Sequence, residues 1–115
     1  MRRGEVFLVD FEPTRGTEAT RTRAAVIVSN DAATRAAERA GRGVVTVAPI
    51  SSNVSRVFPF QVPLRAGEAG LRVASKIQTE QVRAVTVVRF GRYLGSLSPA
   101  GMTALDAALR LHLGL

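Results

Sequence analysis

Residues 4–31, GEVFLVDFEPTRGTEATRTRAAVIVSND, carry the pattern that decides the fold. Two apolar runs within it, residues 5–11 and 24–28, are short and rich in β-branched and aromatic side chains, which is typical of β-strands. The polar stretch between them, residues 12–22, is much longer than a tight hairpin tip requires and holds glycine, threonine and arginine. Such a stretch is either a plain solvated loop or a functional segment, and the spacing alone favours the plain loop.

The rest of the chain predicts more short strands. They are expected at residues 44–50, 57–62, 71–76, 82–85 and 87–90, the last leading toward 93–95. Pro49 and Pro59 lie inside two of these segments and predict an edge, a bulge or a strand end there. Short strands with little helix indicate a small, strongly curved sheet or barrel. The length of 115 residues predicts a single domain, residues 1–115.

Two helices are expected. The first covers residues 32–40, with Asn30 or Asp31 as its cap and Gly41 at its end. The second begins after Ser98, which is a good cap, with Pro99 at its first position and apolar residues at helical spacing. Most of that apolar stripe is expected to face the core, and part of it could face a second copy of the chain.

The charge of the chain predicts an acidic partner. The net charge is +7, with 16 basic residues of which Lys76 is the only lysine. Arginine binds phosphate through two parallel hydrogen bonds and stacks on bases, so a nucleic acid or an acidic protein is expected. Aromatic residues make up only 5% of the chain, so a surface for stacking bases is poorly supplied.

The residues that the chain lacks exclude several kinds of site. The absence of cysteine excludes disulfides and thiolate chemistry, and a single histidine, His112, excludes a histidine metal cluster. No metal or cofactor is therefore expected. No apolar run approaches the roughly 20 residues of a membrane helix, and acidic residues interrupt any signal-peptide core. These features fit a cytoplasmic protein.

The order of the N-terminal motifs is similar to that of a known family. Residues 10–13 (DFEP), 16–19 (GTEA), 23–24 (RA) and 26–31 (VIVSND) resemble the opening of the MazF/PemK family of toxin endoribonucleases. Two residues depart from the family pattern: Ala19 stands where Gln is usual, and Ala24 where Pro is usual. The acid and the arginine of the pattern are retained, and the resemblance continues to the last helix.

This resemblance implies both a fold and an activity. The fold would be an SH3-like small barrel with a short helix after the second strand and a C-terminal helix. The activity would be that of the toxin of a type II toxin–antitoxin pair, a sequence-selective, metal-independent endoribonuclease acting on single-stranded RNA. The 2′-hydroxyl would attack, giving a 2′,3′-cyclic phosphate and a 5′-hydroxyl. The family also implies a homodimer and an acidic, MazE-like antitoxin.

Three residues are expected to carry the reaction. Arg23 matches the essential arginine of the family, and its guanidinium would stabilise the charge that develops on the phosphate. Ser51, in the segment APISSN, takes the place of a family threonine whose hydroxyl completes the site. Glu18 is either a general base or a reader of a base edge. From the residues alone, Arg23 is one more solvated arginine and Ser51 belongs to an ordinary turn.

Other polar residues around these motifs are expected to contact RNA. In the second half of the chain, residues 79–85 (TEQVRAV) resemble a further segment of the family, and Gln81 in it is a plausible contact to an unpaired base. The same residues could instead satisfy backbone groups in a turn. His112 lies outside the expected site. The expected RNA contacts are Arg15, Thr17, Arg21, Ser52, Asn53, Ser75, Gln78 and Gln81.

Two other functions remain open from the sequence. Gyrase-poisoning toxins such as CcdB share the barrel, and a basic SH3-like module can bind nucleic acid without cutting it. A catalytically inactive regulator is a further reading, which Ala19 and Ala24 favour. The pairing of Arg23 with Ser51 favours cleavage, because a binding module does not need it.

Overall fold

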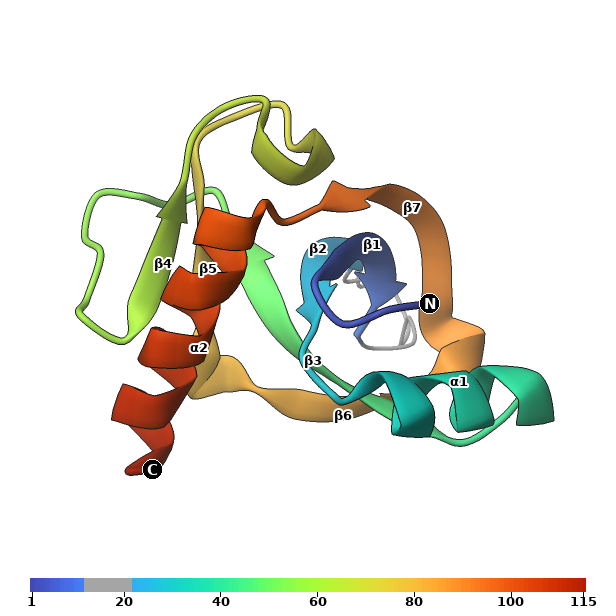
Figure 1. The fold of residues 1–115 in the computed structure, drawn as a ribbon. Coiled ribbons are helices and arrows are strands. Elements are labelled where there is room, and N and C mark those ends of the chain that lie inside the picture. The colour runs from blue at the N-terminus through green and yellow to red at the C-terminus, as the bar shows by residue number, and fades with distance from the viewer. Residues whose placement is uncertain (12–21) are drawn as a thin grey trace, which may run out of the picture.

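A strongly curved antiparallel sheet forms the centre of the molecule (Figure 1). The structure, a computed structural model, describes residues 1–11 and 22–115. Within these residues the strands follow the order β4-β5-β3-β2-β1-β7, and β6 pairs with β3 beside this path. Their bounds are β1 Glu5–Asp10, β2 Thr22–Ile27, β3 Val44–Ser51, β4 Gln61–Leu64, β5 Ser75–Gln78, β6 Arg83–Thr86 and β7 Phe90–Ser96.

The central strand β3 changes its neighbour part-way along. Residues Val44 to Val47 pair with β6, whereas Ile50 and Ser51 pair with β5. Pro49 lies between the two pairings, where its missing N–H costs no ladder bond to either strand. The predicted irregularity at Pro49 is therefore a change of neighbouring strand.

Residues 25–27 of β2 and 47–50 of β3 are buried, which explains why these parts of the two strands are apolar runs. Val26 and Ile50 pack into a core with Leu105 of the C-terminal helix, whereas Ile27 and Val47 pack into a second core with Val9. Side chains alternate across a strand, so each strand supplies both cores. The edge strands β4 and β7 are not paired with each other in the part of the chain that is described, so the sheet is curved but not closed.

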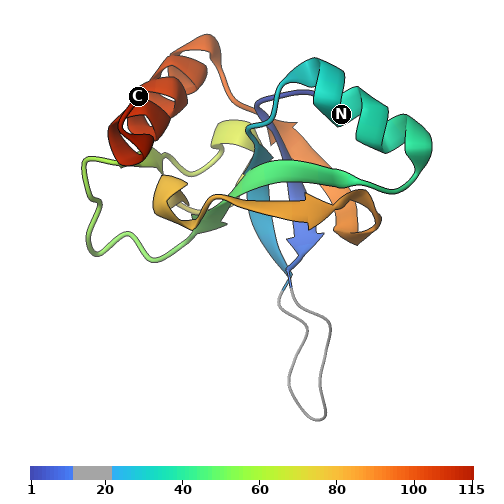
Figure 2. The same cartoon turned by 90° about the horizontal axis from the view of Figure 1, so that it is seen from below.

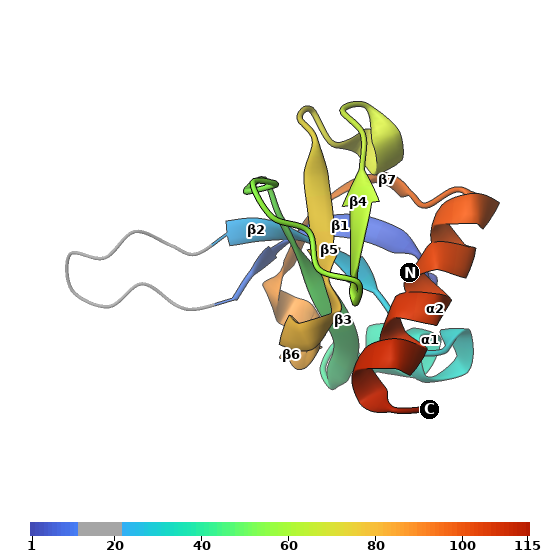
Figure 3. The same ribbon diagram turned by 90° about the vertical axis from the view of Figure 1, so that its left-hand side faces the viewer.

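The two helices have the predicted caps. Helix α1 (Asp31–Ala40) begins with the Asn30 side chain accepting from the Ala33 N–H and ends at Gly41, which has a φ of 70°. Helix α2 (Pro99–Leu113) begins with Ser98 accepting from the Gly101 N–H. Both helices lie toward one side of the molecule, and the ends of β1 and β2 that flank residues 12–21 lie on the other (Figures 2 and 3).

The structure corrects three of the predicted strands. The strand expected at 57–62 begins only at Gln61, because Phe58 and Phe60 stack on each other and the Gln61 side chain accepts from the Phe58 N–H. The strand expected at 71–76 covers 75–78 instead, and the strand expected at 87–90 is mostly a short helix. The short 3₁₀ helices are η1 Glu68–Gly70, η2 Thr79–Gln81 and η3 Val87–Arg89.

Close backbone packing explains why the strand expected at residues 71–76 begins only at Ser75. Gly70 lies in η1 with a φ of 75° and its Cα faces the Leu94 carbonyl of β7 so closely that a Cβ would overlap it. This contact places η1 against β7 and brings Leu71 into the core. The predicted fold class, mostly β with a short and a C-terminal helix, is confirmed. None of the helices in the described ranges is long and apolar enough to cross a membrane.

Candidate active site

A hollow of about 530 Å³ lies where β2 begins and β3 ends, and we call it the strand-end hollow. Ala25 of β2 pairs with Pro49 of β3 in antiparallel register, so the first residues of β2 lie beside the last residues of β3 (Figure 3). The hollow therefore draws on residues far apart in the sequence. Its lining consists of Arg23, Ala24, Ile50, Ser51, Ser52, Leu71, Val73 and Ser75.

Arg23 presents a positive charge at this hollow. Its side chain is exposed, and its Nη2 donates to the Gln78 Oε1 at 2.6 Å and, at 3.5 Å, to the carbonyl of Ile50. Within residues 1–11 and 22–115, no carboxylate lies within ion-pair distance of Arg23. Both oxygens that accept from the guanidinium in the described residues are neutral, so neither of them cancels its charge.

Ser51 places a hydroxyl in the same hollow. Its Oγ accepts from the Asn53 N–H at 3.1 Å, and the Asn53 side chain accepts in turn from Ser55. This is the Ser-Ser-Asn turn that the sequence predicts. Because Oγ accepts in this turn, its own hydrogen remains available for donation to a phosphate oxygen. The structural and the chemical interpretations of Ser51 are therefore compatible.

The remaining predicted residues divide into three groups. Ser52 is exposed on the lining, while Ser75 is buried and donates to the Val73 carbonyl, which makes it a structural part of the wall. Gln78 contacts Arg23, but Asn53 and Gln81 are not on the lining, and Gln81 is exposed in η2. The predictions for Arg15, Thr17, Glu18 and Arg21 lie outside the described residues.

Sequence reasoning missed the apolar side of the hollow. Leu71 is buried and Val73 is 55% exposed, and both line the hollow together with the polar residues. Their alternation was the signal for a strand, so they were expected in a ladder and not beside a site. An apolar wall next to a cation and two hydroxyls suits a ligand with both a phosphate and a flat base.

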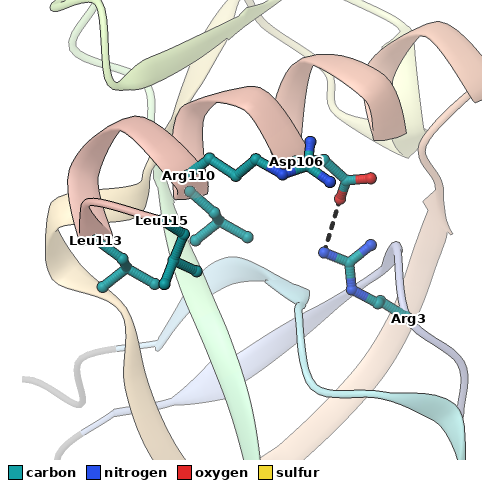
Figure 4. Close-up of a pocket in the computed structure, with 6 residues that line it drawn as sticks. Arg3, Asp106, Arg110, Leu113 and Leu115 are labelled. Atoms are coloured by element: carbon teal, nitrogen blue, oxygen red, sulfur yellow. Dashed lines mark ion pairs between the residues drawn. The ribbon is translucent and has the colours of Figure 1, made fainter.

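A second hollow, of about 320 Å³, lies along α2 and contains none of the predicted site residues. Arg3 forms an ion pair of 2.8 Å with Asp106 there, as Figure 4 shows, and its Nε donates to the carbonyl of Val28. Arg3 thereby connects the N-terminal segment, the end of β2 and α2. Nearby, the His112 ring lies 5.7 Å from the Phe60 ring, away from the strand-end hollow.

The chemistry available at the strand-end hollow is restricted. In the described ranges no three His, Asp or Glu side chains gather in a way that could hold a metal ion. The hollow instead offers a guanidinium, hydroxyls and backbone groups. Such groups bind a phosphate and stabilise charge on its oxygens.

Comparison with known proteins identifies the family. The family model described as PemK-like, MazF-like toxin of type II toxin-antitoxin systems matches residues 2–113. The chain belongs to this toxin family. It is 51% identical to endoribonuclease MazF9 of Mycobacterium tuberculosis over 115 residues, which cover 100% of the chain and 98% of the relative. It is also 32% identical to endoribonuclease MazF of Staphylococcus epidermidis, over 100% of the chain and 92% of that protein.

Solved structures of MazF proteins have the same fold. An endoribonuclease from a mycobacterial species, solved with its cognate antitoxin, superposes with a TM-score of 0.77 at 23% identity, over 100% of this chain and 96% of that one. A MazE–MazF structure from Deinococcus radiodurans gives a TM-score of 0.77 at 22% identity, over 100% and 96% of the two chains. The predicted family and the predicted class of enzyme, a toxin endoribonuclease of a toxin–antitoxin system, are confirmed.

Proposed function

We propose that this MazF-family toxin endoribonuclease cleaves single-stranded RNA at the strand-end hollow without a metal ion. The observation that carries the proposal is that Arg23 of β2 and Ser51 of β3 line one hollow although they lie far apart in the sequence. RNA contains its own nucleophile, the 2′-hydroxyl next to the phosphorus. A protein that holds the chain open and stabilises the developing charge can therefore cleave it.

Each residue has a defined role in this proposal. The 2′-hydroxyl loses its proton as its oxygen attacks the phosphorus, the bond to the 5′-oxygen breaks, and the 5′-oxygen gains a proton, which leaves a 2′,3′-cyclic phosphate and a 5′-hydroxyl. The Arg23 guanidinium stabilises the charge on the nonbridging oxygens and donates a hydrogen bond, but it is not the base because a guanidinium keeps its proton in proteins. Ser51 Oγ donates to the same phosphate. Glu18 is proposed as base reader or proton acceptor on the grounds of the sequence resemblance alone.

The first test of this function uses a mixed RNA pool with excess EDTA. The expected result is a discrete set of fragments, because the proposed reaction needs no metal and the enzyme selects a sequence. A requirement for added magnesium, or equal cutting of DNA, would reject the mechanism. Inhibition of DNA supercoiling by a protein that leaves RNA intact would instead support a gyrase-directed toxin.

The proposal also covers partners and location. An acidic antitoxin suits a toxin of net charge +7, and structures of related MazF proteins have been solved with an antitoxin. A homodimer would cover leucines that α2 exposes in the chain alone: Leu111 and Leu113 are 58% and 51% exposed. Light scattering that shows a monomer at micromolar concentration would contradict the dimer. The proposed unit is a single toxin domain, residues 1–115, acting in the cytoplasm, where its RNA substrate is found.

A further inference from the structure

The contact between Arg23 and Gln78 joins two strands that are not neighbours in the sheet. Arg23 lies on β2 and Gln78 ends β5, and β3 runs between them. The 2.6 Å contact joins Arg23 Nη2 to the amide of Gln78. Arginine has donors only, so the amide atom that faces it must be the carbonyl oxygen. The oxygen of Gln78 is therefore occupied by the arginine, and only its NH₂ group remains for other partners.

A neutral partner has a specific consequence for the arginine. A carboxylate would fix the guanidinium but would also cancel its charge, as Asp106 does for Arg3 at 2.8 Å. The Gln78 amide fixes the direction of the guanidinium without adding a negative charge. An arginine that must stabilise a phosphate in a transition state needs both a defined direction and an intact charge.

Gln78 is itself held firmly by its surroundings. Its backbone pairs with Gln61 of β4, and Gln61 is buried and donates through Nε2 to Glu80 at 2.8 Å. The next residue, Thr79, is fully buried, and its hydroxyl donates to the carbonyl of Phe60. The end of β5 is thus held by strand pairing at Gln78 and by the side-chain hydrogen bond of Thr79. A hydrogen-bond acceptor on such a support can restrict a long arginine side chain that is otherwise exposed.

We propose that Gln78 is a positioning residue, which holds the Arg23 guanidinium at the strand-end hollow while leaving its charge intact. This role differs from the base contact expected from the sequence. It rests on the proposed function, since positioning matters for a reaction at Arg23. The Arg23–Gln78 contact is present in the protein without RNA, so it can also be tested without RNA.

Two substitutions of Gln78 test the orientation and the charge of the Arg23 guanidinium separately. Gln78→Met keeps the length of the side chain but removes the acceptor, so the Arg23 guanidinium is no longer held in one orientation by residue 78. Gln78→Glu keeps the acceptor but pairs Arg23 with a negative charge. In both variants the single-turnover cleavage rate at saturating RNA should fall, by about tenfold to a hundredfold, which is the usual effect of a small misplacement or a lost charge interaction at a reacting group.

The readouts for the two variants differ in a way that a purely structural role would not produce. In Gln78→Met the Kd for an RNA with a single 2′-deoxy nucleotide at the cleavage position should change by less than about threefold. NMR relaxation should show that the Arg23 Nε–H group becomes mobile. The Nε–H group of Arg3, which is held by Val28 and Asp106, serves as the internal control. In Gln78→Glu the Arg23 signal should stay ordered, and the Kd should rise because the charge is cancelled.

The outcomes decide between the alternatives. An Arg23 signal that is unchanged in Gln78→Met would overturn the positioning role, whether or not the protein cleaves RNA. A weaker Kd or an altered cleavage sequence in Gln78→Met, with an unchanged rate at saturation, would identify Gln78 as a base reader and also overturn it. A wild-type protein that does not cleave RNA would remove the proposed function, while the NMR comparison would still test the contact.

Discussion

Arg23 and Ser51 face the same hollow because β2 begins where β3 ends. The antiparallel register that pairs Ala25 with Pro49 extends toward these two residues, and Leu71 and Val73 also line the hollow that they share. One cation and one hydroxyl are thereby placed on rigid strand ends.

Removing the guanidinium should abolish cleavage. We expect Arg23→Ala to lower the single-turnover rate by about a hundredfold to a thousandfold, since it removes a charged donor to the developing phosphate charge. Arg23→Lys should recover only part of the rate, because an ammonium cannot form the planar pair of bonds. Thermal unfolding should be nearly unchanged, since the side chain is exposed. Arg39→Ala, which removes an exposed arginine of α1, is the matched control and should cleave like the wild type.

The Ser51 hydroxyl should speed cleavage by donating a hydrogen bond to the phosphate. We expect Ser51→Ala to slow cleavage by about a hundredfold, in the range found when one donor to a reacting oxygen is removed. Ser51→Thr should retain most of the activity, because it keeps the hydroxyl and its bond to the Asn53 N–H. The measurement is the single-turnover rate at saturating RNA. Equal rates for the alanine and threonine variants would show that the hydroxyl has no part in the reaction.

The close contact of Gly70 with β7 gives a prediction about stability. Gly67 and Gly70 both have positive φ, 93° and 75°, so alanine is strained at either position, by about 1–3 kcal/mol. A Cβ at Gly67 would meet nothing within 4 Å, whereas one at Gly70 would overlap the Leu94 carbonyl. Gly70→Ala should therefore cost about 1–3 kcal/mol more than Gly67→Ala in denaturant unfolding. Equal losses would mean that η1 does not pack on β7 as described.

The fold could be predicted further than the site. The caps Asn30 and Ser98 and the apolar runs of β1 and β2 depend on local sequence, and they appear where expected. Leu71 and Val73 alternate like a strand but line a hollow, because the packing of Gly70 on β7 overrides the local pattern. The Arg23–Gln78 contact spans 55 residues and exists only because of the strand order, which periodicity does not reveal.

The antitoxin and RNA should compete for one surface. We predict that an acidic antitoxin tail engages Arg23 and therefore displaces an RNA that carries a 2′-deoxy nucleotide at the cleavage position. Both affinities should fall as salt rises, because exposed charges are screened and counterions are released. Fluorescence anisotropy with labelled RNA measures the competition at several salt concentrations. A ternary complex of toxin, antitoxin tail and RNA would contradict a shared surface.

The central claim is that the RNA supplies the nucleophile and that Arg23 and Ser51 act on its phosphate without a metal. The most direct measurement compares two oligonucleotides in excess EDTA, identical except that one has a single 2′-deoxy nucleotide at the cleavage position. Mass spectrometry of the products should show a 2′,3′-cyclic phosphate and a 5′-hydroxyl from the first, and no cleavage of the second. Cleavage of the 2′-deoxy oligonucleotide at the same position, or cleavage of either only when magnesium is added, would contradict the account.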